Sequence, residues 1–172
     1  MIRSLLHATL FLVLAALGMG PGAGCGSESR SGEVEVHVDT IAVDAASNSP
    51  VIILEELAGD RSLPIWIGIN EARSIAAELG NEEPIRPNTH DLAKRLIDDL
   101  EGAVERVVVT ELAEGIYYAL ILVRVHGRTI AVDARPSDAI AIGLRYQAPL
   151  FVREVLFRDS LEVEYENPGQ KV

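Results

Sequence analysis

The stretch "VDARPSDAIAIGLR" (residues 132–145) decides the fold, because it joins the end of a strand directly to the start of a helix. The apolar run before it stops at Asp133, and an apolar pattern with the helical period begins after Pro136, which suits a first helical turn. Four polar residues lie at this junction: Asp133, Arg135, Ser137 and Asp138. They either only end the strand and start the helix, or they also take part in chemistry.

A second junction repeats this design. "IRPNTHDLAKRL" (85–96) and "ARPSDAIAIGL" (134–144) both run Arg-Pro, a small polar residue, an Asp and then an apolar helical pattern. Each helix therefore has an Arg just before its first turn and an Asp inside it, where a carboxylate meets the positive end of the helix dipole. We predict Thr89 and Ser137 as capping residues of these two helices.

Working outward, the sequence predicts an α+β fold with a mainly antiparallel sheet and three inserted helices in a single domain. A phase shift of the apolar pattern at Ile41 and Val43 predicts a bulge or a bend, and Asn70 and Gly80 are predicted to cap the first helix. The expected strands are 33–39, 51–57, 63–69, 103–115, 116–127, 128–134 and 149–156, with turns at Glu114–Gly115 and His126–Gly127, and the expected helices are 71–79, 90–102 and 136–147.

The N-terminus has the pattern of an export signal. A short positive start, the apolar run "LLHATLFLVLAALGMG" and the small residues "PGAGC" predict a lipoprotein-type signal peptide over 1–24, with Cys25 as the lipidated first mature residue. An ordinary signal peptide with Cys25 left as a thiol is the alternative. A polar linker (25–32), the folded domain (33–158) and a flexible acidic tail (159–172) follow. We expect an exported protein of the cell envelope that touches the membrane surface through its lipid only, with no transmembrane helix in the mature protein.

The charge balance limits the partners of the chain. It carries 15 basic and 26 acidic residues, a net charge of −11. Such a charge repels polyanions at long range and argues against a non-specific nucleic-acid binder. A local basic groove is still compatible with it, since 13 of the 15 basic residues are Arg, whose guanidinium forms forked contacts with phosphate.

Other residues are interpreted as structural. Trp66 in "LPIWIG" is predicted to pack in the core or at an interface rather than to stack on a base, and His37 and His126 are predicted to be solvated. The sequence has no G-x-S-x-G elbow and no H-x-H, C-x-x-C or H-E-x-x-H signature. The usual motifs of serine hydrolases and zinc sites are therefore missing.

The polar clusters leave two interpretations open. In the structural interpretation, Asp91 and Asp138 stabilise helix starts by roughly 0.3–1 kcal/mol each, and the neighbouring charged side chains form ion pairs. In the chemical interpretation, the two helix starts face each other, so that their N–H groups bind phosphate together with Arg86 and Arg135.

The chemical interpretation also needs a cation and a proton carrier. The carboxylates of Glu71, Asp91, Asp133 and Asp138 could hold a divalent cation, Mg²⁺ or Mn²⁺, through oxygen. His90, next to Asp91, would transfer a proton. These are the parts that hydrolyse a phosphodiester: neutralised charge, an activated water and a proton donor.

Four segments of the chain resemble a known family. "LPIWIGINEARSIAAEL", "PIRPNTHDLAKRLIDDL", "VVVTELAEGIYYALILV" and "VDARPSDAIAIGLRYQAPLFVREVL" together look like the bifunctional nuclease domain, over about residues 33–158. The resemblance implies an α+β domain that cleaves DNA and RNA and forms a wedge-shaped homo-oligomer, expected to be a homodimer, with a broad groove at its thick end. The family's polar signatures fall on Glu71, Arg86, Thr89, His90, Asp91, Asp133, Arg135, Ser137 and Asp138.

The first functional hypothesis is a nuclease, a hydrolase of DNA and RNA phosphodiester bonds assisted by a divalent metal. Its catalytic residues would be His90, Asp91, Asp133 and Asp138, with Asp91 orienting His90; Arg86, Arg135, Ser137 and Thr89 would bind phosphate, and Asp133, Asp138 and Glu71 the metal. The alternative is a catalytically silent, membrane-tethered oligomeric binding or scaffold module of the same fold, in which these residues serve as caps and ion pairs.

Overall fold

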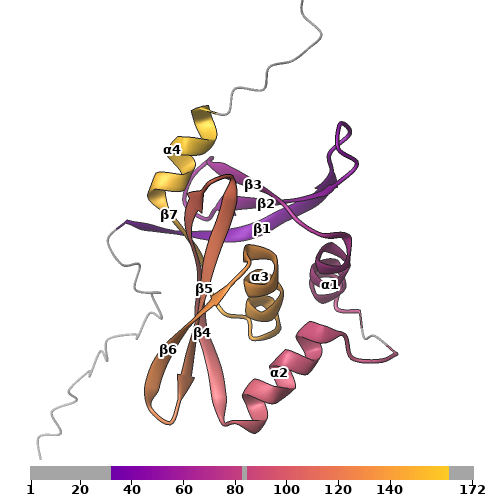
Figure 1. The fold of residues 1–172 in the computed structure, drawn as a ribbon, viewed down its shortest axis with the longest axis vertical. Coiled ribbons are helices and arrows are strands. Elements are labelled where there is room, and N and C mark those ends of the chain that lie inside the picture. The colour runs from indigo at the N-terminus through magenta and orange to yellow at the C-terminus, as the bar shows by residue number, and fades with distance from the viewer. Residues whose placement is uncertain (1–31, 83–84, 163–172) are drawn as a thin grey trace, which may run out of the picture.

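The computed structural model describes residues 32–82 and 85–162, which form an α+β domain (Figure 1). Its one sheet has seven strands in the order β3-β2-β1-β7-β4-β5-β6, and every neighbouring pair is antiparallel except β4 and β7. The predicted α+β class with a mainly antiparallel sheet is therefore confirmed. The elements are β1 (Glu33–Val43), β2 (Pro50–Glu56), β3 (Ser62–Trp66), α1 (Ile69–Leu79), α2 (Thr89–Asp99), β4 (Gly102–Ala113), β5 (Ile116–Val125), β6 (Arg128–Ala134), α3 (Pro136–Arg145), β7 (Leu150–Arg153) and α4 (Glu154–Glu162).

The strand connections follow the turn residues. β4, β5 and β6 are joined by turns at Glu114–Gly115 and His126–Gly127, whose residues all have positive φ between 48° and 77°. Two residues with positive φ match the twist of the strands that they connect, so both predicted hairpin turns are confirmed. The predicted bulge in β1 is also present, between Val38 and Thr40.

The first two helices begin with N-cap residues other than those predicted. The N-cap of α1 is Gly68 rather than Asn70. Gly80 is its C-cap, as predicted, but the left-handed conformation, with a φ of 52°, falls on the next residue, Asn81. The N-cap of α2 is Asn88 rather than Thr89. Asn88 is the N-cap because its side-chain oxygen accepts hydrogen bonds from two amides of the first turn.

The C-terminal segment contains a fourth helix that the sequence pattern did not predict. The expected strand 149–156 is wrong in its second half, since β7 stops where its pairing with β1 ends at Arg153. The chain then turns into α4, which places Leu156 and Phe157 in the core, with the guanidinium of Arg61 4.8 Å from the Phe157 ring centroid. The first four residues of the predicted tail, 159–162, belong to α4.

Other predictions about the ends of the chain lie outside the described residues. These are the signal peptide, Cys25, most of the linker and residues 163–172. Within the described ranges no helix combines the length and apolar character that crossing a bilayer requires.

Helix α3 lies at the centre of the domain, in contact with α1, α2, β4 and β5 (Figure 1). Seven of its ten residues are buried. It reaches the sheet through Gly143, where an added Cβ would lie 2.8 Å from Val107 Cγ2 and 3.2 Å from Leu150 Cδ2. Only glycine fits at that distance, so the seating of α3 depends on this residue.

Candidate functional site at the start of helix α3

The first turns of α2 and α3 meet, as the chemical interpretation requires. His90 of α2 places its Nε2 3.1 Å from Asp138 Oδ1 of α3. The His90 ring is nearly buried, whereas the Asp138 carboxylate is partly exposed. Two segments 48 residues apart in the sequence thus share one polar cluster.

Arg135 connects this pair with α1. Its Nε donates to Asp138 Oδ2 at 2.6 Å, and its Nη2 donates to Glu71 Oε1 at 2.7 Å and to Asp138 Oδ1 at 3.0 Å. The Arg135 side chain is 65% exposed, while both carboxylates are more buried. The guanidinium therefore lies over the two carboxylates at the protein surface.

The ionisation of these groups follows from the contacts. Burial works to raise the pKa of Asp138, but hydrogen bonds from Arg135 and His90 outweigh it, so the pKa lies below the ordinary 3.8. The pKa of Glu71 is lowered by its own backbone N–H and then by Arg135, and the two carboxylates raise the pKa of Arg135. All three groups are charged near neutral pH.

A buried second layer holds the cluster from behind. Arg145, at the end of α3 with a side chain only 4% exposed, donates through Nη2 to Ser74 Oγ at 2.9 Å and through Nε to Asp91 Oδ1 at 2.7 Å. Ser74 Oγ lies 2.8 Å from His90 Nδ1, and Asn88 Nδ2 donates to the same oxygen at 3.2 Å. Sequence reasoning missed Ser74 and Arg145; the available signal was the polar Arg145 seven residues after Asp138, on the same face of an otherwise apolar helix.

These contacts fix the tautomer of His90. A serine hydroxyl has one proton to donate and two lone pairs. Because Ser74 Oγ accepts from both Arg145 and Asn88, its own proton points to His90 Nδ1. The ring proton of His90 then lies on Nε2, which donates a hydrogen bond to Asp138 Oδ1.

Asp91 has a different place from the one predicted. Its carboxylate accepts from the backbone N–H of Asn88 at 2.8 Å and from Arg145, and so closes the capping box of α2. Burial works to raise the pKa of Asp91, but these two donors lower it overall. His90 is oriented by Ser74 and Asp138, not by Asp91.

The structure does not bring Asp133 to this cluster. Asp133 pairs with Leu120 across β5 and β6, and Leu120 packs on the sheet face opposite α3. Its neighbour Val132 instead faces α2 and α3, next to Ile142. The metal set predicted from Asp133, Asp138 and Glu71 is therefore not assembled.

One group of His and carboxylate side chains does place three ligand atoms within 4.8 Å of one another in the described ranges. It consists of His37, Asp39 and Glu55, on β1 and β2. His37 and Asp39 are exposed, and no hydrogen bond or ion pair among the described residues joins the group to the α3 cluster. His37 is solvated, as predicted.

Arg86 and Thr89 lie at a separate cavity. They line a space of about 350 Å³ together with Arg95 and neighbouring residues of the α2 start. Both side chains are exposed. Among the described residues, no hydrogen bond or ion pair connects either of them with Arg135.

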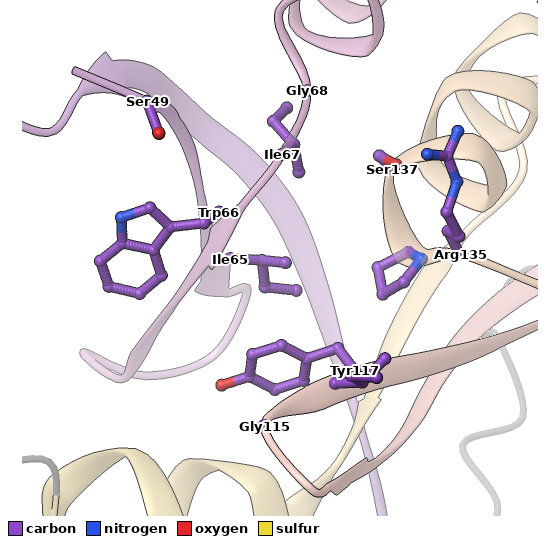
Figure 2. Close-up of a pocket in the computed structure, with 11 residues that line it drawn as sticks. Ser49, Ile65, Trp66, Ile67, Gly68, Gly115, Tyr117, Arg135 and Ser137 are labelled. Carbon is purple, nitrogen blue, oxygen red and sulfur yellow. The ribbon is translucent and has the colours of Figure 1, made fainter. Parts of the chain in front are cut away.

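A larger cavity of about 380 Å³ opens beside Arg135 (Figure 2). Trp66 and Ile65 lie on one side of it and Arg135 and Ser137 on the other, with the ring of Tyr117 below them. Pro136 also lines it. Trp66 is 48% exposed, so it does not pack in the core of this chain, and packing at an interface, the other half of the prediction, stays a prediction. Ser137 is buried but caps nothing, because α3 has no side-chain cap.

The sequence is similar to known proteins across this region. The profile of the Bifunctional nuclease domain matches residues 52–164. An uncharacterized protein of Mycobacterium tuberculosis (strain CDC 1551 / Oshkosh) is 46% identical over 116 residues, which make up 67% of this chain and 69% of that protein. "Bifunctional nuclease 1" of Oryza sativa subsp. indica is 28% identical over 131 residues, 74% of this chain and 40% of the plant protein. "Bifunctional nuclease 1" of Arabidopsis thaliana is 27% identical over 124 residues, 70% of this chain and 38% of the plant protein.

The matched region runs from β2 into the segment after α4 and contains the whole polar cluster, from Glu71 to Arg145. It also covers more than half of the chain. The chain therefore belongs to the bifunctional nuclease domain family.

Proposed function

We propose that this chain is a nuclease that hydrolyses phosphodiester bonds of DNA and RNA at the junction of α1, α2 and α3. The observation that carries the proposal is the exposed guanidinium of Arg135 over the His90–Asp138 pair. A cation at the surface beside an ionised carboxylate can bind a phosphate and hold a water next to it. Family membership supports the same reaction class.

Arg135 would bind the phosphate. Its Nε and Nη2 are used by carboxylates, but Nη1 makes no hydrogen bond or ion pair within the described residues and points two N–H donors elsewhere. A phosphate competes with Glu71 and Asp138 for this guanidinium. Arg135 is therefore the first contact of the substrate.

Asp138 would accept the proton of the attacking water. When Arg135 turns towards a phosphate, Asp138 loses hydrogen bonds that lower its pKa, and it becomes a stronger base. His90 donates a hydrogen bond from its Nε2–H to Asp138 and thus orients the carboxylate. In this arrangement His90 positions the base rather than abstracting the proton itself.

The predicted divalent cation carries no step in this proposal, because the residues present do not fit it. The guanidinium of Arg135 lies between the Glu71 and Asp138 carboxylates, and Asp133 is on the other face of the sheet. The need for Mg²⁺ or Mn²⁺ stays a prediction that the assay tests.

The experiment measures cleavage of fluorescent single-stranded RNA and DNA by the purified chain, with EDTA and with added Mg²⁺ or Mn²⁺. Asp138→Asn is compared with Asp99→Asn, a matched change at an exposed residue of α2. Loss of cleavage in the first variant only supports the proposal. Equal activity of the wild type and Asp138→Asn would contradict it.

The alternative function is a silent binding or scaffold module, and one observation favours it. Every fully enclosed polar side-chain atom among the described residues has a hydrogen-bond partner, so the cluster is complete without a substrate. In that case Asp138→Asn lowers only the melting temperature, and the wild type cleaves neither nucleic acid.

We also propose that the chain forms a homodimer. β6 is an edge strand, and an apolar cavity of about 240 Å³ lies between it and α2. Leu96 of α2, the C-cap residue Leu100 and Ile130 of β6 are each at least half exposed, and a second copy could cover them. Analytical ultracentrifugation of the wild type and Ile130→Lys tests this, and a monomeric wild type would contradict it.

Export and lipid anchoring complete the proposal. Cys25 and the signal pattern before it support a lipid-anchored protein of the cell envelope. Mass spectrometry of the protein from membranes of its own host measures the acyl mass on the N-terminal peptide. Cys25→Ser is the control, and an unmodified Cys25 would contradict the anchor.

A further inference from the structure

The start of α3 is open to a ligand in a way that the start of α2, which Asn88 caps, is not. Pro136 has no N–H, and the first helical hydrogen bond runs from Ala139 N to Arg135 O at 3.0 Å. The amides of Ser137 and Asp138 precede that bond, and no side chain caps them. These amides and the helix dipole favour an anion.

Ser137 adds a second, independent feature. The residue is only 6% exposed, and its hydroxyl makes no hydrogen bond to any described residue. No fully enclosed side-chain oxygen in the described ranges lacks a partner. The Ser137 hydroxyl must therefore be open to the cavity that it lines. A buried, unpartnered hydroxyl that faces a cavity beside Arg135 is a ready hydrogen-bond partner for a phosphate.

The opposite wall is aromatic. Trp66 donates its indole N–H to Asp44 Oδ2 at 3.3 Å, and this bond holds the half-exposed ring in place at the cavity. Ile65 lies beside Trp66, and the ring of Tyr117 lies below them (Figure 2). An exposed aromatic ring of fixed orientation is a platform on which a nucleobase can stack.

We propose that this cavity is the subsite for one nucleotide of the substrate, with its phosphate at Ser137 and Arg135 and its base against Trp66. The volume of about 380 Å³ lies within the range of sites for ligands of this size, and one wall is polar and the other aromatic. The assignment rests on the proposed nuclease function. Because Arg135 belongs to both the subsite and the catalytic cluster, the bound phosphate lies next to Asp138.

Binding is tested with adenosine 5′-monophosphate and, separately, with inorganic phosphate. Trp66 is the single tryptophan of the chain, so quenching of its fluorescence reports stacking directly. We expect the nucleotide to quench the fluorescence and to bind roughly tenfold or more tightly than phosphate, which lacks the base. Absence of quenching at millimolar nucleotide, or equal affinity for the two probes, would overturn the proposal.

Variants separate the two walls. Calorimetry should show that Ser137→Ala and Trp66→Leu each weaken nucleotide binding roughly tenfold. Trp66→Leu should leave phosphate binding unchanged.

Matched controls are Ser62→Ala, an exposed serine of β3, and Tyr118→Leu, an aromatic residue on the other face of β5 from Tyr117. Circular dichroism checks folding, and Trp66→Phe, which keeps a ring, should restore part of the affinity. Equal binding by Trp66→Leu and the wild type would overturn the assignment.

The failures of subsite and nuclease are distinguishable. Nucleotide binding as described, with no cleavage of RNA or DNA, keeps the subsite and removes the nuclease. Cleavage with a KM that neither Ser137→Ala nor Trp66→Leu changes keeps the nuclease and removes the subsite.

Discussion

The starts of α2 and α3 have similar sequences but different structures. In each, an Asp stands three residues after the N-cap: Asp91 after Asn88, and Asp138 after Arg135. Asn88 accepts two amide hydrogen bonds and Asp91 reaches back to its N–H, so α2 is closed on itself. The side chain of Arg135 has no acceptor atom, so it cannot cap the first amides of α3, and Asp138 turns to Arg135 and His90 instead.

This difference teaches that the identity of the N-cap residue decides which helix start is available for binding. An Asn at the N-cap uses the amides for stability. An Arg in the same position leaves them to a ligand and adds a charge that attracts anions. The two starts are therefore not equivalent phosphate sites, although their sequences suggest that they are.

The largest effect on stability is expected from removing Arg145, which connects α3 with the first turn of α2. Arg145→Met removes the buried cation that bonds to Asp91 and Ser74 and leaves the Asp91 carboxylate without its cationic partner. We expect the free energy of unfolding to fall by about 3 kcal/mol, as for other broken buried pairs. Urea denaturation measures it, with the exposed Arg128→Met as the control. A loss below about 1 kcal/mol would contradict a structural role for Arg145.

The next effect separates chemistry from capping. Asp138→Asn should lower kcat roughly 100-fold or more by removing the proposed base. Asp91→Asn should mainly lower stability, because its carboxylate serves the cap of α2 and Arg145. Cleavage rates and melting temperatures of both variants are measured together. The comparison fails if Asp91→Asn loses kcat as strongly as Asp138→Asn while remaining folded.

A smaller effect compares the cap positions directly. Asn88→Ala should cost about 1 kcal/mol of stability, because two amides lose their acceptor. Ser137→Ala should change stability by less than about 0.5 kcal/mol, since its hydroxyl bonds to nothing in the described protein. Thermal unfolding measures the loss of stability in each of the two variants. Equal losses would show that α3 is capped after all.

The smallest expected effect is on the acid side of the stability profile. The folded-state pKa values of Glu71, Asp91 and Asp138 lie below their unfolded values near 4. Their contribution to stability is therefore complete above pH 5 and is lost as the pH falls below 4 through the folded values. Urea midpoints between pH 2 and pH 6 measure this loss. Asp91→Asn should make the profile flatter, and an unchanged profile would contradict the role of Asp91.

The local patterns of the sequence predicted much of the fold. Alternation, apolar runs and turn residues were enough for most strands and for both hairpin turns, because these depend on neighbours in the chain. The pattern failed at 154–156, where apolar residues of strand-like composition continue into α4. Only the end of pairing with β1 at Arg153 separates the two elements.

The site was predicted in part for the same physical reason. The meeting of His90 with Asp138 follows the repeated helix-start design, but Arg145 and Ser74 are 71 residues apart and share no local signal. Asp133 is close to Asp138 in sequence, yet strand alternation turns it to the other face of the sheet. Trp66 was predicted to pack in the core or at an interface, because only the tertiary fold shows that it lines a cavity.

Gly143 has a consequence for how function is inherited in such chains. A single methyl group there would collide with Val107 and tilt the whole helix, and the tilt would be felt about 10 Å away at Arg135 and Asp138. A descendant could retain all the charged and polar side chains of the centre and still lose turnover. Catalytic activity in this domain therefore depends on the close packing of Gly143 against the sheet as much as on the polar side chains at the start of α3.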